Sequence, residues 1–153
     1  ELSLLAPRLP MPLDPFHSKI RKGPIMTRTN YDIGVASQTG HFSDAVEVRG
    51  AARWLFTAGT PGLEVGGILP PDITGQAELA WRHIVTMLEK AGMTVNDLVK
   101  VTQYLVRPAD IAPYRQVRTR ILGTARPASM LMVVAQLPKP EFLLEIEVVA
   151  AVG

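Results

Sequence analysis

The side chains best placed to do chemistry lie in the last strand-like run of the sequence, Phe142 to Ala150. Alternate residues of a strand point to opposite faces, so this run has one wholly apolar face and one that carries Glu145 and Glu147. A carboxylate in that position could hold a water and exchange a proton as a general acid or base. It could equally accept a structural hydrogen bond at a subunit interface. The spacing alone favours the structural role for both glutamates.

Two arginines are candidates for binding a carboxylate, because a guanidinium can donate paired hydrogen bonds to one. Arg115 and Arg126 could fill this role, or each could be a solvated surface residue. The three histidines show no metal-ligand spacing and the chain has no cysteine, so we predict no metal site. The sequence also lacks a Gly-x-Ser-x-Gly motif and a convincing phosphate-binding loop.

Length and composition bound the class of protein. A chain of 153 residues with 47% apolar and 20% charged residues is typical of one soluble globular domain. It has no apolar run of about 18 residues, so we expect no contact with a membrane. Residues 1–25 carry the net charge of +2 and the remainder is neutral, which argues against nucleic acid as a partner. The absence of cysteine fits a reducing compartment, and we predict a cytoplasmic protein.

The elements that must position these residues follow from hydrophobic periodicity. Residues 1–32 are predicted to form a proline-rich arm or extension, and residues 33–153 the folded domain. Within the domain, residues 45–48 and 53–58 read as the two strands of a hairpin. A loop rich in glycine and proline, residues 59–71, follows.

Two helices are predicted in the second half of the chain. The first begins after Asp72 as its N-cap and ends before Gly92, which suits a left-handed position. The second opens at Asp110 and ends at Gly123. Residues 98–106 form a strand between the helices, and two further strands follow the second helix.

The predicted element order is ββαβαββ. Two amphipathic helices can cover only one face of a five-stranded mixed sheet, which gives a two-layer α/β (α+β) domain. The other face would expose apolar residues together with Glu145. We therefore expect subunits to pack sheet to sheet, with Glu145 in or beside a cleft between subunits.

Several motifs resemble those of one known family, in the same order and with similar spacing. They are Gly40–Val46 (GHFSDAV), Leu55–Gly59 (LFTAG), Gln76 in the first helix, Asp97–Thr102 (DLVKVT), Pro127-Ala128, Leu137-Pro138 and Glu145–Glu147 (EIE). Over residues 33–152 the chain is similar to the RidA (YjgF-type) reactive-intermediate deaminases, formerly grouped as endoribonuclease L-PSP.

This resemblance implies a chorismate-mutase-like fold assembled as a homotrimer with clefts between subunits. It further implies hydrolysis of an enamine or imine acid to a keto acid and ammonia, without metal or organic cofactor. The glutamate that matches Glu145 would support this hydrolysis with a bound water. An arginine after Pro-Ala would bind the substrate carboxylate.

The chain departs from the family pattern at the anion-binding position. Ser129 stands where the family has that arginine, Arg115 aligns with a helix asparagine, and Phe42 replaces a tyrosine. Glu145 and Gly59 are retained. We predict Glu145 as the catalytic residue, and a substrate-binding set made of Phe42, Gly59, Arg115, Arg126, Ser129 and Leu131.

Three functions remain open on this basis. The first is a deaminase with an altered specificity pocket, in which Arg115 or Arg126 replaces the missing arginine. The second is a trimer that binds a small carboxylate without catalysis, because Ser129 cannot neutralise a charge. A ribonuclease, suggested by the older family name, is the third, and the neutral body of the chain argues against it.

Overall fold

The structure, a computed structural model, describes residues 25–153. Its helices and strands are β1 (Thr27–Tyr31), α1 (Ala36–Thr39), β2 (Ala45–Arg49), β3 (Arg53–Phe56), β4 (Thr60–Pro61), α2 (Ile73–Lys90), β5 (Leu98–Leu105), α3 (Ile111–Leu122), β6 (Ala128–Val133) and β7 (Leu144–Val152). Residues 1–24 of the predicted arm lie outside the described residues. Among the helices of the described part, none is long and apolar enough to cross a membrane.

The two predicted helices are confirmed, and their ends follow local chemistry. The Asp72 side chain accepts a hydrogen bond from the Gly75 backbone N–H at 2.9 Å and so caps the start of α2. Beyond the helix ends, Gly92 and Gly123 have φ values of 68° and 53°. Glycine adopts this left-handed region without the steric cost of a β-carbon, so both helices end where the sequence indicates.

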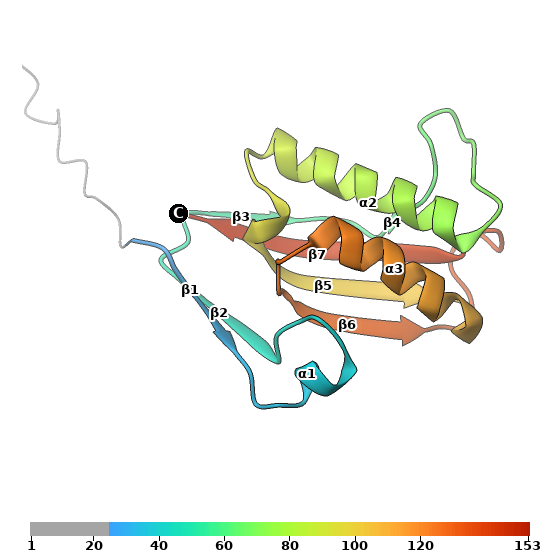
Figure 1. The fold of residues 1–153 in the computed structure, drawn as a ribbon. Helices are drawn as coiled ribbons and strands as arrows, with labels where there is room; N and C mark the ends of the chain where they lie inside the picture. Colours follow the sequence, from blue (N-terminus) through green and yellow to red (C-terminus); the bar gives the residue numbers. More distant parts are fainter. Residues whose placement is uncertain (1–24) are drawn as a thin grey trace, which may run out of the picture.

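The main sheet is mixed, and its strands lie in the order β3-β7-β5-β6, with β4 also beside β7. Strands β5 and β6 are parallel, whereas β7 is antiparallel to its neighbours. Both long helices lie on one side of this sheet (Figure 1). The core fills the space between these layers, and the predicted apolar face of β7 is buried there. The two-layer α/β fold is therefore confirmed.

The predicted hairpin of residues 45–48 and 53–58 is wrong. Strand β2 pairs with β1 instead, from Thr27↔Arg49 to Tyr31↔Ala45, and these two form a separate sheet. Strand β3 pairs with the end of β7, where Arg53 is opposite Val152. Every residue of β3 has a partner on the long strand β7, which is remote in sequence. Strand β1 lies within the range predicted as an arm, and the domain boundary at residue 33 stays a prediction.

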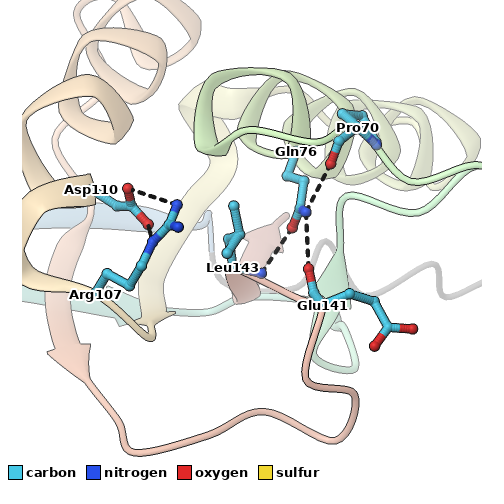
Figure 2. A network of polar contacts seen from close by, with 6 residues as sticks. All are labelled: Pro70, Gln76, Arg107, Asp110, Glu141 and Leu143. Carbon is cyan, nitrogen blue, oxygen red and sulfur yellow. Dashed lines mark hydrogen bonds and ion pairs between the residues drawn. The ribbon is translucent and has the colours of Figure 1, made fainter.

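A buried glutamine connects α2 to the chain that enters β7. Gln76 is 1% exposed, and its amide nitrogen donates to the carbonyls of Pro70 (2.9 Å) and Glu141 (3.1 Å). Its amide oxygen accepts from the Leu143 backbone N–H at 2.9 Å (Figure 2). These three bonds satisfy backbone groups of two loops at once. They fix the start of β7, and thereby the position of Glu145.

An ion pair fixes the start of α3 in a similar way. Arg107 donates two hydrogen bonds to the Asp110 carboxylate, at 2.7 and 3.1 Å, just before the helix begins (Figure 2). Asp110 is 6% exposed, so its charge requires this partner. The pair sets where the side chains of α3 meet the edge of the sheet.

Candidate active site

Glu145 lies on the sheet face opposite the helices. It is paired with Tyr104 of β5 on one side and Pro61 of β4 on the other. Burial raises the pKa of the Glu145 carboxyl above its ordinary value of 4.5. A carboxyl group with a raised pKa is better suited to exchange protons near neutral pH.

Gly59 provides the space that this carboxylate occupies. A β-carbon at Gly59 would lie 2.6 Å from Oε2 of Glu145, so any larger residue there would force the carboxyl group to move. The loop is held there by Thr57, whose hydroxyl accepts a hydrogen bond from the Val148 backbone N–H at 2.9 Å. The two retained residues of the predicted site are therefore in direct contact.

Glu147 lies one pleat further along the same face and has a different environment. Its carboxylate accepts a hydrogen bond from the Tyr104 hydroxyl at 3.3 Å. Burial, followed by the negative charge of Glu147, raises the pKa of Tyr104. Glu147 is thus engaged by a neighbouring side chain within the same chain, which agrees with a structural role.

A cavity of about 300 Å³ lies on the other side of the sheet, between β6, α3 and the end of α1. It contains four residues of the predicted substrate-binding set: Phe42, Arg115, Ser129 and Leu131. Its remaining lining residues are Thr39, Gln103, Ile111, Arg118 and Met130.

The loop before β2 places Phe42 at this cavity. The Ser43 backbone N–H donates to the Pro127 carbonyl at 3.3 Å, and the Ser43 hydroxyl donates to the Arg126 carbonyl at 2.8 Å. The Asn30 side-chain amide of β1 donates to the Ser43 hydroxyl oxygen at 2.8 Å and to the Arg126 carbonyl at 2.9 Å. The start of β6 therefore holds the loop on which Phe42 lies.

Sequence reasoning missed Arg118, a further residue of this cavity. It is 7% exposed, its Nη2 donates to the Ser129 hydroxyl at 3.1 Å, and its guanidinium lies 5.8 Å from the centre of the Phe42 ring. Its position four residues after Tyr114 places it on the buried face of α3. This spacing could have identified Arg118 from the sequence, because a charged residue on the apolar face of a helix requires a partner and so indicates a site.

Arg126 lies outside this cavity. Its Nη1 donates to the carbonyls of Gly123 (2.9 Å) and Ala125 (3.0 Å), and it lines a second hollow beside Phe42 and β1. The structure therefore gives no support to Arg126 as the replacement for the missing arginine.

The cavity and Glu145 occupy opposite faces of the sheet within one chain. Gln103 is paired with the buried Ile146, whereas Tyr104 is paired with Glu145. Directly paired residues point to the same face, so Gln103 and the cavity share the face of the helices. A ligand in the cavity of an isolated chain cannot contact the Glu145 of that chain.

These features define a class of protein: a two-layer domain with a mixed sheet, a small cavity at one sheet edge, and a carboxyl group of raised pKa on the other face. This second face, which no helix covers, is called the bare face below. The family model described as Endoribonuclease L-PSP matches residues 35–152. The chain belongs to this family, which includes the RidA deaminases, and the resemblance seen in the sequence is confirmed.

Individual relatives are similar over most of their length. A RutC family protein of Pyrococcus abyssi is 35% identical over 113 residues, which are 72% of this chain and 86% of the relative. The 2-iminobutanoate/2-iminopropanoate deaminase of Mus musculus is 28% identical over 116 residues, 74% of this chain and 83% of that protein. The crystal structure of Escherichia coli TdcF with bound serine has a TM-score of 0.62 and 27% identity, and covers 74% of this chain and 90% of that chain.

Proposed function

We propose that this protein hydrolyses a small enamine or imine acid to the keto acid and ammonia. The observation that carries this proposal is the contact between Gly59 and Glu145, in which a glycine leaves room for a carboxyl group of raised pKa. Membership of the family and the name of the mouse relative, an iminoacid deaminase, agree with this reaction class.

The chemistry requires one water and no redox change. An enamine first takes a proton on carbon and becomes an iminium. Glu145 then holds a water at the iminium carbon and accepts a proton from it as the C–O bond forms, which gives a carbinolamine. It passes this proton to the nitrogen, the C–N bond breaks and ammonia leaves, and the hydroxyl proton returns to Glu145 as the carbonyl forms. A carboxyl group that alternates between its two protonation states serves both steps.

We further propose that the active assembly is a homotrimer, in which the cavity of one subunit faces Glu145 and Gly59 of the next. The opposite positions of the cavity and Glu145 in one chain support this arrangement. Exposed apolar side chains on the bare face support it too: Trp54, Phe56 and Met132. Apolar residues gathered on one face of a sheet favour association.

The test measures ammonia release from freshly generated enamines of several small amino acids. Glu145→Gln should abolish release, because an amide cannot exchange the proton. Glu147→Gln is the matched control and should retain activity, since Glu147 is held by Tyr104. If Glu145→Gln or Glu145→Ala turned over every substrate as fast as the parent, the mechanism would be wrong.

A further inference from the structure

The guanidinium of Arg118 is buried without a counter-charge. None of the acidic side chains in residues 25–153 forms an ion pair with it. Its Nε is fully buried and has no hydrogen-bond partner within that range. Burial lowers the pKa of Arg118, and the positive charges of Arg115 and Arg126 add to this effect. A buried, unpaired cation is costly, so an anion bound beside Arg118 would stabilise it.

The Ser129 hydroxyl can donate a hydrogen bond to an anion bound beside Arg118. Its hydroxyl oxygen accepts one bond from Arg118 and another, at 3.0 Å, from the amide nitrogen of Gln103. The Gln103 amide orientation is fixed, since its nitrogen also donates to the Met130 carbonyl and its oxygen accepts from the Tyr114 hydroxyl. With two bonds accepted, the Ser129 hydroxyl retains its proton for a ligand.

A second guanidinium lines the same cavity. Arg115 lies one turn before Arg118 on α3, and its Nη2 donates to the Thr39 carbonyl at 2.8 Å. This bond uses one of the five N–H groups of Arg115 and leaves the charge uncompensated. The lining of the cavity contains two arginines and no acidic residue.

We infer that this cavity binds a small dicarboxylate, with Arg118 and Ser129 holding one carboxylate and Arg115 the other. The volume of about 300 Å³ suits a molecule of this size. This inference rests on the proposed function and narrows it: the substrate is the enamine or imine of an acid with two carboxylates. Arg118 acts from α3, whereas the resemblance implies an arginine on β6, so the anion is held by a different element.

The test uses glutarate and its monoamide, 5-amino-5-oxopentanoate, which match in shape and differ by one charge. Isothermal titration calorimetry of the full chain should show glutarate binding at least about tenfold more tightly, because a hydrogen-bonded ion pair stabilises by about 1.5–3 kcal/mol. Equal affinity for the two probes would overturn the inference.

Two variants test which carboxylate each arginine binds. Arg118→Gln should weaken glutarate binding by about ten- to a hundredfold. Arg115→Gln, at an exposed position where folding is not at risk, should make the two probes bind equally. Arg120→Gln is the matched control on the same helix, because Arg120 pairs with Glu78 outside the cavity. Unchanged glutarate preference in Arg115→Gln, or equal weakening in Arg120→Gln, would contradict the assignment.

The outcomes separate this inference from the proposed function. Glutarate is not an enamine, so its binding is measured without turnover. Glutarate binding in a protein that releases no ammonia from any enamine would overturn the deaminase alone. Deamination of enamines with a single carboxylate, combined with equal binding of the two probes, would overturn the dicarboxylate site alone.

Discussion

Ser129 occupies the position where the family resemblance implies an arginine, and Arg118 brings a guanidinium to within 3.1 Å of its hydroxyl from another element. The sequence predicts the gap at Ser129, because the flanking motifs fix the alignment. It does not predict Arg118, since which side chain reaches across from α3 depends on how the helix is placed against β6. At the residue scale, the family resemblance singles out Glu145 and Gly59 as candidates but does not predict the side chains that surround them.

Replacement of Gly59 by alanine should damage catalysis more than folding. The new β-carbon would lie 2.6 Å from Oε2 of Glu145 and would displace the carboxylate. A displacement of about 1 Å costs about a hundredfold in rate, so kcat/KM for ammonia release should fall by that order. Gly66→Ala is the control, because no atom lies within 4 Å of its β-carbon position. Similar activity in the two variants would exclude the contact as a catalytic requirement.

Glu145 should also leave a signature in the pH dependence of stability. Burial raises its pKa above the ordinary 4.5, so the folded state binds this proton more tightly than the unfolded state. Its ionisation therefore lowers the free energy of unfolding as pH rises from 4.5 through the folded-state pKa, after which the loss is constant. Below 4.5 both states are protonated and the effect is absent.

Glu145→Gln mimics the protonated form and should remove this loss. The free energy of unfolding of the variant, relative to the parent, should rise as pH increases above about 4.5 and then level off. Urea denaturation from about pH 4 to about pH 8, at one protein concentration, measures this difference. A difference that stays constant over this interval would contradict the raised pKa.

At the scale of elements, the network of Gln76 ties α2 to the start of β7. Replacement by leucine would leave the Pro70 and Glu141 carbonyls and the Leu143 N–H without their partner. Each of the three buried groups left unsatisfied costs about 1–3 kcal/mol, so Gln76→Leu should lower the free energy of unfolding by about 3 kcal/mol or more. Urea denaturation measures the change.

Gln116→Leu provides the comparison for this prediction. Gln116 is exposed on α3, so the same chemical change there should alter the free energy of unfolding by less than about 0.5 kcal/mol. If Gln76→Leu were equally mild, water would have to satisfy the three backbone groups in its place, and the network would not be what positions β7.

The helices and strands differ in how far the sequence predicts them. The helix ends can be predicted from local residue types, because Asp72, Gly92 and Gly123 determine only the conformation of their immediate neighbours. Strand partners are set at long range. Residues 45–48 and 53–58 have the pattern of a hairpin, yet each pairs with a strand from elsewhere in the chain. The local pattern of these two runs does not indicate that one pairs with β1 and the other with β7 rather than with each other.

At the scale of the whole molecule, the bare face of the sheet connects fold and function. Phe56 is 70% exposed there, stacked on Trp54 at 6.3 Å between ring centroids and paired with Val149 of β7. In the proposed homotrimer this face is covered by neighbouring subunits, and Glu145 reaches a neighbour's cavity. Oligomerisation and deamination should therefore be lost together.

Phe56→Asp tests this link. A carboxylate placed in an apolar interface loses its hydration without gaining a partner, a cost of several kcal/mol. Sedimentation velocity should show the parent at about three times the chain mass of 16.7 kDa. The variant should sediment as a single chain at the same concentration. Ammonia release should fall with it, although Phe56 lies outside the cavity.

Val65→Asp is the matched control, because Val65 is fully exposed on the loop between β4 and α2, and a charge there should change neither mass nor activity. Full activity in a monomeric Phe56→Asp protein would mean that one chain suffices for the reaction. Glu145 could then not act on a ligand in the cavity, because the two lie on opposite faces of the same sheet. The assembled state is thus the point on which the proposed site depends.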